Sequence, residues 1–152
     1  MSSTETLSVP GTMQVNAVFY EDSYAKLEFD PIIRCVKLTL DGVPRYSEHY
    51  QFVQQKRIEL VKRESKKFGR VNLLTDSSTA GPVLDEDIAF FKHQILPEME
   101  KAGVRFLAIV MPESKFTQLT IREMTERSRS IAVKYFDSMR EARSWLRNNS
   151  NF

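Results

Sequence analysis

The chain is poor in the residues that most often carry catalysis or bind metals. It has one cysteine and two histidines, so an intrachain disulfide is excluded and a Cys/His metal site would lack ligands. Neither a GxGxxG nor a GxxxxGK[ST] motif occurs, so phosphate binding by a glycine-rich loop has no support. The sequence shows no set of nucleophile, general base and charge-stabilising residue of the kind that an enzyme active site needs. The sequence therefore predicts a non-enzymatic protein that needs no cofactor and no metal.

A strong charge of one sign and a long apolar run are also missing. The formal net charge is +2, and the basic residues of segment 56–70 and of the C-terminal third are interspersed with acids, which is typical of solvated surfaces rather than nucleic-acid sites. No segment approaches the roughly 20 apolar residues that span a bilayer. The first residues lack the basic and apolar regions of a secretory signal. We therefore expect a cytoplasmic protein with no nucleic-acid partner and no membrane span.

What is present is an initial hairpin pattern followed by alternating strand and helix patterns. Strands are expected over 24–29, 35–40, 71–75, 105–110 and 131–136, and helices over 47–68, 85–102, 114–127 and 138–148. This order predicts an α/β fold with a mixed sheet of about five strands and four helices. We expect one domain over residues 18–148, a flexible N-terminal segment over 1–17 and a frayed C-terminus over 149–152.

Several residues mark where these helices begin, end or break. Gly69 is a C-terminal stop for the first helix. The Thr-x-x-Glu spacing at Thr120 predicts a capping box that divides segment 114–127 into two helices, and Ser138 begins a second such box. Pro97 lacks an amide proton and should kink or restart the second helix.

The element order and three motifs resemble the STAS domain, and most closely the small stand-alone SpoIIAA-like proteins of bacteria. The motifs are LTLDG at 38–42, KAGVRFLAIVMPES at 101–114 and FDSMREARSWL at 136–146. The resemblance implies a regulatory module that acts through protein–protein contacts, with an anti-sigma factor or a kinase-like protein as partner and a homodimer as one assembly.

In the STAS antagonists, a partner kinase phosphorylates a serine within an Asp-Ser-Ser-Gly-like motif at the start of the second helix. The matching positions here are Asp76, Ser77 and Ser78, with Thr79 where that motif has glycine. The apolar run 71–75 predicts a strand that ends at Asp76 and presents these hydroxyls in a loop. The resemblance thus implies a phospho-switch and partner contact at Asp76–Thr79.

A second hypothesis is a carrier or sensor of a small, lipid-like apolar ligand, since SpoIIAA-like proteins are similar in shape to CRAL-TRIO lipid-exchange domains. It requires a cavity between the sheet and the helices that contain Phe90, Phe91 and Phe116. Phe116, Leu119 and Ile121, which follow Pro112, could form the lip of such a pocket; ordinary core packing is the favoured explanation of these three residues.

The remaining polar residues have ordinary interpretations. His49 and His93 lie amid charged neighbours, which predicts surface positions, while Cys35 is expected to be a small buried side chain.

Arg57 and Glu64 lie within the apolar arc of helix 47–68. The favoured account places their stems along the edge of the core and their charged heads in water. The alternative is a polar patch on a surface that binds a partner. The acidic run 85–87 predicts helix capping rather than a cation site.

Overall fold

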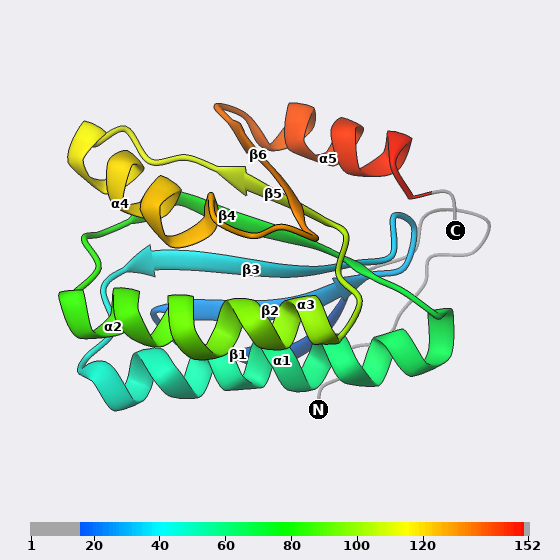
Figure 1. The fold of residues 1–152 in the computed structure, drawn as a ribbon, viewed down its shortest axis with the longest axis horizontal. Coiled ribbons are helices and arrows are strands. Elements are labelled where there is room, and N and C mark those ends of the chain that lie inside the picture. The colour runs from blue at the N-terminus through cyan, green and yellow to red at the C-terminus, as the bar shows by residue number, and fades with distance from the viewer. Residues whose placement is uncertain (1–15, 151–152) are drawn as a thin grey trace.

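Six strands form one mixed sheet in residues 16–150, the part of the chain that this computed structural model describes (Figure 1). They are β1 (Ala17–Glu21), β2 (Ala25–Asp30), β3 (Cys35–Gly42), β4 (Asn72–Ala80), β5 (Phe106–Val110) and β6 (Ala132–Phe136). The strands lie side by side in chain order; β1 to β3 are antiparallel and β3 to β6 are parallel. The α/β fold with its hairpin and alternating units is confirmed, with six strands instead of about five. Residues 1–15 and 151–152, which hold most of the expected N-terminal segment and half of the expected C-terminal one, lie outside the described residues.

The strand that the sequence did not reveal is β1. It lies at the edge of the sheet, none of its residues is fully buried, and its pairing with β2 shifts register between Val18 and Tyr20. Because strands are recognised by alternation of buried and exposed residues, an edge strand with mostly accessible side chains gives little signal.

Four helical units cover the two faces of the sheet. The first is α1 (Ser47–Phe68); α2 (Asp85–Phe90), the π-helical η1 (Phe91–Ile95) and α3 (Leu96–Lys101) follow one another without a break as the second; α4 (Lys115–Thr125) and α5 (Met139–Asn148) are the others. Their number agrees with the four predicted helices. No helix of residues 16–150 combines the length and the apolar character needed to cross a bilayer.

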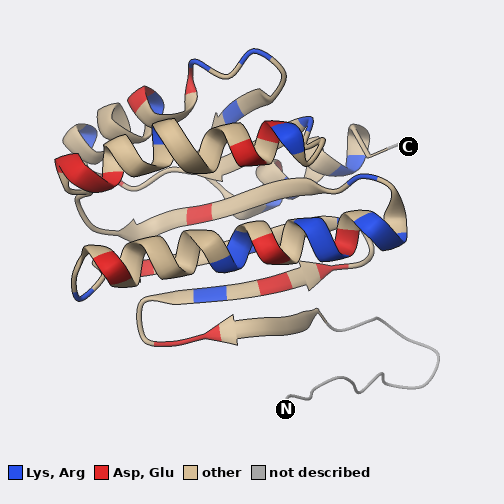
Figure 2. Cartoon of the chain, turned by 60° about the horizontal axis from the view of Figure 1, so that its bottom comes forward, with Lys and Arg blue, Asp and Glu red and all other residues tan. Residues whose placement is uncertain are grey.

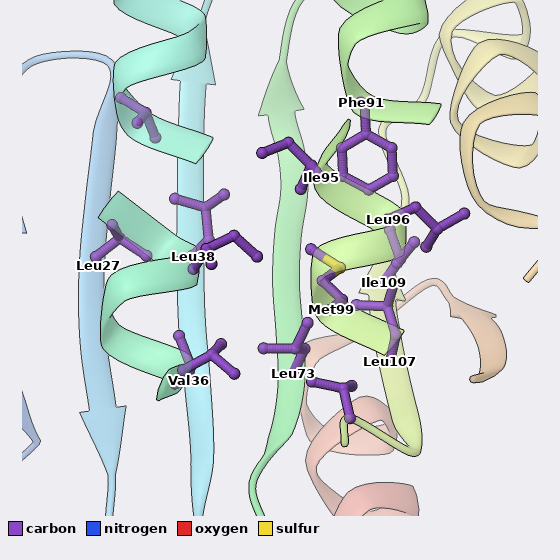
Figure 3. Close-up of a cluster of buried hydrophobic side chains, with 14 of the residues drawn as sticks. Leu27, Val36, Leu38, Leu73, Phe91, Ile95, Leu96, Met99, Leu107 and Ile109 are labelled. Atoms are coloured by element: carbon purple, nitrogen blue, oxygen red, sulfur yellow. The ribbon is translucent and has the colours of Figure 1, made fainter. Parts of the chain in front are cut away.

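The pleat of the central strands divides the core into two layers. Leu73 of β4 and Leu107 of β5 belong to the larger cluster, which packs under α1, the α2–α3 unit and α4, whereas Leu74 and Ala108 face α5 on the other side. Successive residues of a strand point to opposite faces, so each strand supplies both layers. Figure 3 shows the larger cluster, with Phe91, Ile95 and Met99 directed toward the side chains of β4 and β5.

The predicted helix ends are correct in two cases and wrong in one. Gly69 ends α1 with φ of 84°, a conformation that glycine adopts readily. The Ser138 hydroxyl accepts a hydrogen bond from the Glu141 amide at the start of α5. Thr120, however, lies inside a single helix α4, whose cap is Ser114, and its hydroxyl bonds the Phe116 carbonyl. The capping-box pattern at Thr120 was misleading because a helix interior accommodates the same spacing.

Pro97 coincides with a change of helix type, as predicted. The π-helical turn η1 ends at Ile95, immediately before the turn of α3 that contains Pro97. A proline cannot donate the amide hydrogen bond of a helix interior. The wider turn and the restart of the α-helix accommodate it without ending the helical unit.

Candidate functional site

The segment Asp76–Thr79 lies in strand β4, not in a loop. The strand runs on to Ala80 because β3 also continues, to Gly42, and supplies partners for the backbone. The expectation that the strand ends at Asp76 is therefore wrong. Polar side chains at a strand end do not stop a strand whose neighbour remains available for pairing.

The four residues of this segment also differ in exposure. Ser77 is only 3% exposed, while Ser78 and Thr79 are exposed. The Ser78 amide and hydroxyl both donate to Asp76 Oδ1, at 3.0 and 2.7 Å, and the Thr79 hydroxyl donates to the Leu40 carbonyl at 3.0 Å. The structure thus separates the buried Ser77 from the accessible Ser78 and Thr79.

A cavity of about 370 Å³ opens where β3 and β4 end. It lies between the sheet and the helices α1, α2 and α4, on the larger-core side of the sheet. Its apolar wall includes Leu107, Ile109, Ile121 and Met124. The carboxyl ends of parallel strands are a common place for ligands in α/β proteins, and this volume falls within the range of small-molecule sites, about 300–1,000 Å³.

Two loops form the rim of the cavity. One joins β3 to α1 and brings Val43 and Tyr46, and the other joins β4 to α2 and brings Leu84. These three large apolar side chains are each more than half exposed. The loops are packed closely together, since the Gly81 amide donates to the Gly42 carbonyl at 2.7 Å.

The side chain of Arg57 lies deep in this cavity wall. It is 3% exposed; Nη1 donates to Thr75 Oγ1 at 2.8 Å, Nη2 donates to Gln54 Oε1 at 2.7 Å, and Nε has no partner. The guanidinium also lies 6.0 Å from the centre of the Phe91 ring. The prediction that this head reaches water is wrong, because α1 lies flat on the sheet and Arg57 points between them.

Burial of Arg57 has an electrostatic cost. Desolvation lowers the pKa of its guanidinium from 12.5 to about 10, although the tyrosines Tyr50 and Tyr24 act in the opposite direction. The group is therefore still charged at neutral pH. No carboxylate of residues 16–150 lies within ion-pair distance of it.

Glu64, by contrast with Arg57, is a buried charged residue that has partners of opposite charge. It is also buried, also against the prediction, but it pairs with Arg63 at 3.1 Å and with Lys67 at 3.9 Å. Its charge is therefore compensated by its own helix, while that of Arg57 is not.

Further polar groups of the cavity are Tyr24, Tyr50 and Asp87. Burial raises the pKa of both phenols and of the Asp87 carboxyl. The Ser47 hydroxyl hydrogen-bonds Asp87, and Asp87 Oδ1 has no partner. A mainly apolar cavity with a few directed polar groups is the usual composition of a small-molecule site.

A hydrogen-bond network around Asp22 fixes the start of α1 beside the rim. Asp22 Oδ2 accepts from His49 Nε2 at 2.7 Å and from the Tyr20 hydroxyl, while Oδ1 accepts from the amides of Tyr24 and Ala25, both at 2.8 Å. Burial alone would raise the pKa of Asp22, but these bonds outweigh it and lower the pKa to about 2. The bond to Asp22 raises the pKa of Tyr20 to about 12.

The network also corrects the prediction for His49. It is 6% exposed, and its Nδ1 accepts from the Arg45 amide at 3.1 Å. The ring proton therefore resides on Nε2 and points to Asp22. His93 is exposed, as predicted, and Cys35 is buried, as predicted.

The three phenylalanines predicted to line an apolar pocket have different positions. Phe91 lines the cavity and is 3% exposed. Phe90 is partly buried and meets Tyr50 edge to face with ring centres 6.5 Å apart, while Phe116 is 69% exposed on α4. Of the proposed lip, Ile121 lines the cavity and Leu119 is 66% exposed. The proposed pocket set is therefore brought together only in part.

The acidic run Asp85–Asp87 does not cap α2 through its side chains. The residue at the capping position is Leu84, without a side-chain bond. Asp85 and Glu86 are exposed in the first turn, where negative charge is favourable, and Asp87 turns inward. Among the described residues, no group of three or more His, Cys, Asp or Glu side chains is placed to hold a metal ion.

The basic residues of α1 alternate with acidic ones along its outer surface, as Figure 2 shows. Lys62 pairs with Glu98 at 3.2 Å and Lys56 with Glu59 at 3.5 Å. The interpretation as a solvated mixed surface agrees with this, except for Arg57 and Glu64, which are buried.

Comparison with protein-family models and with curated proteins gives no match to this chain. The resemblance to the STAS family therefore stays a prediction, and the cavity is interpreted from its own residues.

Proposed function

We propose that this chain is a cytoplasmic, non-enzymatic, STAS-like binding module that holds a small, largely apolar ligand in the cavity above β3 and β4. The observation that supports this most directly is the cavity itself. Protein interiors are close-packed, with few voids larger than a water molecule. A cavity of about 370 Å³ lined by Phe91, Leu107 and Ile121 is far larger than such packing defects. It also opens between two loops, which gives a ligand a route inward.

The volume sets an upper limit on the ligand. It lies near the lower end of the range for small-molecule sites, about 300–1,000 Å³. A single short hydrocarbon chain or a compact ring system fits this space, and a two-chain lipid does not. The proposed role is that of a carrier or sensor for such a molecule.

The first experiment uses a neutral apolar dye, N-phenyl-1-naphthylamine, whose fluorescence rises in an apolar environment. Wild-type protein should bind it saturably with one site per chain. Ala80→Phe places a ring beside the cavity, since Ala80 is one of its lining residues. We expect this variant to bind the dye at least tenfold more weakly.

The matched control is Ala89→Phe, at an exposed position of α2 that does not line the cavity. It adds the same ring to the surface and should bind the dye as the wild type does. Absence of saturable binding to the wild type, or equal affinity for all three proteins, would count against the proposed function. Circular dichroism and urea unfolding establish that Ala80→Phe is folded.

Regulation through protein contact at Asp76–Thr79 is the second candidate function, favoured by the exposure of Ser78 and Thr79 beside the cavity rim. A phosphoryl group on Ser78 adds nearly two negative charges to this surface. Ser78→Asp should then change the set of proteins that the chain retains from a lysate of its host, whereas Ser78→Ala should not. The same proteins retained by both variants and by the wild type would contradict this role.

A further inference from the structure

The buried charged side chains differ in whether they have an opposite charge nearby. Most are compensated: Glu28 by Lys37 at 3.9 Å, Asp30 by Arg143, and Glu64 by Arg63 and Lys67. Among the described residues, the buried side chains of Arg57 and Asp87 form no ion pair, and both line the same cavity. Burying a charge without a partner is expensive, so uncompensated groups are rare away from functional sites.

The two groups lie at different depths of the cavity. Asp87 is bonded by Ser47, the first residue of α1, close to the rim. Arg57 follows ten residues later on the same helix, about 15 Å along its axis at 1.5 Å per residue. Arg57 therefore belongs to the inner end of the cavity and Asp87 to the outer end.

Arg57 also keeps unused hydrogen-bonding capacity. A guanidinium has five N–H donors, and two of them are used, toward Thr75 and Gln54. These two bonds fix the plane of the group against the sheet. The phenols of Tyr24 and Tyr50 line the same cavity, and within residues 16–150 neither hydroxyl has a hydrogen-bond partner.

We infer that the ligand is a small amphipathic acid, whose carboxylate pairs with Arg57 at the inner end and whose hydrocarbon body fills the apolar part of the cavity. This inference rests on the proposed function and specifies its ligand class. Arginine suits a carboxylate because its planar fork donates two parallel hydrogen bonds to the two oxygens. The phenols offer further donors to the same head group.

The pairing also accounts for the otherwise unfavourable position of Arg57. Folding has already largely desolvated the guanidinium, which is 3% exposed, so an arriving carboxylate meets a charge that water screens less than at the surface. An uncharged alcohol of the same length gains the apolar contacts but not this attraction. An amine of the same length is repelled by Arg57 and, among the described residues that line the cavity, finds an anionic partner only in Asp87.

The experiment measures displacement of N-phenyl-1-naphthylamine by decanoate, 1-decanol and decylamine at pH 7.5, where a carboxylate is ionised. We expect decanoate to displace the dye at a concentration at least tenfold lower than decanol, and decylamine to be the weakest. In Arg57→Gln, the affinity for decanoate should fall at least tenfold, while that for decanol should stay within threefold. Arg57→Lys should keep the preference for the acid.

The matched control is Arg63→Gln, which removes a half-exposed arginine from the same helix while Lys67 remains paired with Glu64. This variant should bind the three compounds with the affinities of the wild type. If the dye binds but decanol equals decanoate, if decylamine binds best, or if none of the three displaces it, the inference fails while the proposed function stands. If Arg57→Gln keeps the tenfold preference, Arg57 is not the carboxylate partner. If the dye itself does not bind, the proposed function fails. If Arg57→Gln does not fold, the inference is tested by the displacement of the dye by the three compounds from the wild type and from Arg57→Lys.

Discussion

Replacing Arg57 by methionine tests whether the buried charge serves the architecture or a ligand. The pKa of the guanidinium falls from 12.5 to about 10, and at about 1.4 kcal/mol per pKa unit this corresponds to about 3 kcal/mol against the charged form on folding. Because the folded pKa is below the unfolded one and this group is basic, the penalty is fully present at pH 7. It is lost only as the pH rises through 10 and above.

Replacing Arg57 removes this penalty but also removes two hydrogen bonds. Arg57→Met removes the donors to Thr75 and Gln54, and a buried acceptor left without a partner costs about 1–3 kcal/mol. Both acceptors line the cavity, where water can replace the lost donor, so we take the lower end of this range. The two effects then nearly cancel, and we expect the free energy of unfolding to change by less than about 1 kcal/mol. Methionine has a similar length and fills the same space, which limits any packing loss.

Urea unfolding at pH 7 measures this change, with an unchanged m-value as the sign that both states keep their compactness. Arg143→Met is the matched comparison, because Arg143 pairs with the buried Asp30 and its loss leaves an uncompensated carboxylate. We expect that variant to lose about 2 kcal/mol or more. If Arg57→Met also loses more than about 2 kcal/mol, Arg57 is a structural residue and the reasoning that assigns it to a ligand is refuted.

Three further predictions concern the surroundings of the cavity. Asp22→Ala should lower the free energy of unfolding by about 2–3 kcal/mol at pH 7, because it removes the acceptor of four hydrogen bonds. The pKa of Asp22 is lowered from 3.8 to about 2, so the wild type loses this contribution as the pH falls from 4 to 2. The difference between the two proteins in urea unfolding should therefore shrink over that range. A difference below about 0.5 kcal/mol at pH 7 would show that the network contributes little. Ser77→Asp should lose at least about 2 kcal/mol, since it buries a carboxylate, whereas Ser78→Asp, at an exposed position, should lose less than about 1 kcal/mol. Similar losses for the two would contradict their separation by the pleat of β4. Ser138→Ala should lower the thermal midpoint by the equivalent of about 1 kcal/mol, because it removes the N-cap of α5; an unchanged midpoint would mean that another group replaces the cap.

The sequence predicted the elements that have a clear period or a clear stop. The bounds 47–68 for the first helix coincide with α1, because its apolar positions repeat at the helical period and Gly69 ends it. The buried strand β5 was found from its apolar run. These signals are local, and the neighbours of the segment only reinforce them.

The sequence-based predictions were wrong where neighbouring segments, rather than the local sequence, determine the structure. Strand β4 continues past Asp76 because β3 continues beside it, which no local pattern states. The site was recognised only in part for the same reason. Helical periodicity places Arg57 within the apolar arc of α1, but it tells only which face a side chain lies on, not whether the space beyond that face is filled.

The location of the cavity and the energetics of its wall point in the same direction. An apolar space beneath α1 could be closed by larger side chains, and the buried cation could be replaced by methionine at little cost in stability. Here the chain has both a cavity of about 370 Å³, where packing contacts are missing, and a desolvated guanidinium whose two hydrogen bonds only offset its cost, so neither feature stabilises the isolated protein. Where several local choices add nothing to stability at one place, while the rest of the fold follows the ordinary rules of packing and pairing, the place is expected to serve binding. The compensated pairs Asp30–Arg143 and Glu64–Arg63 show that this fold does neutralise buried charges elsewhere. The uncompensated charge of Arg57 is therefore best understood as one half of an ion pair whose other half is the ligand.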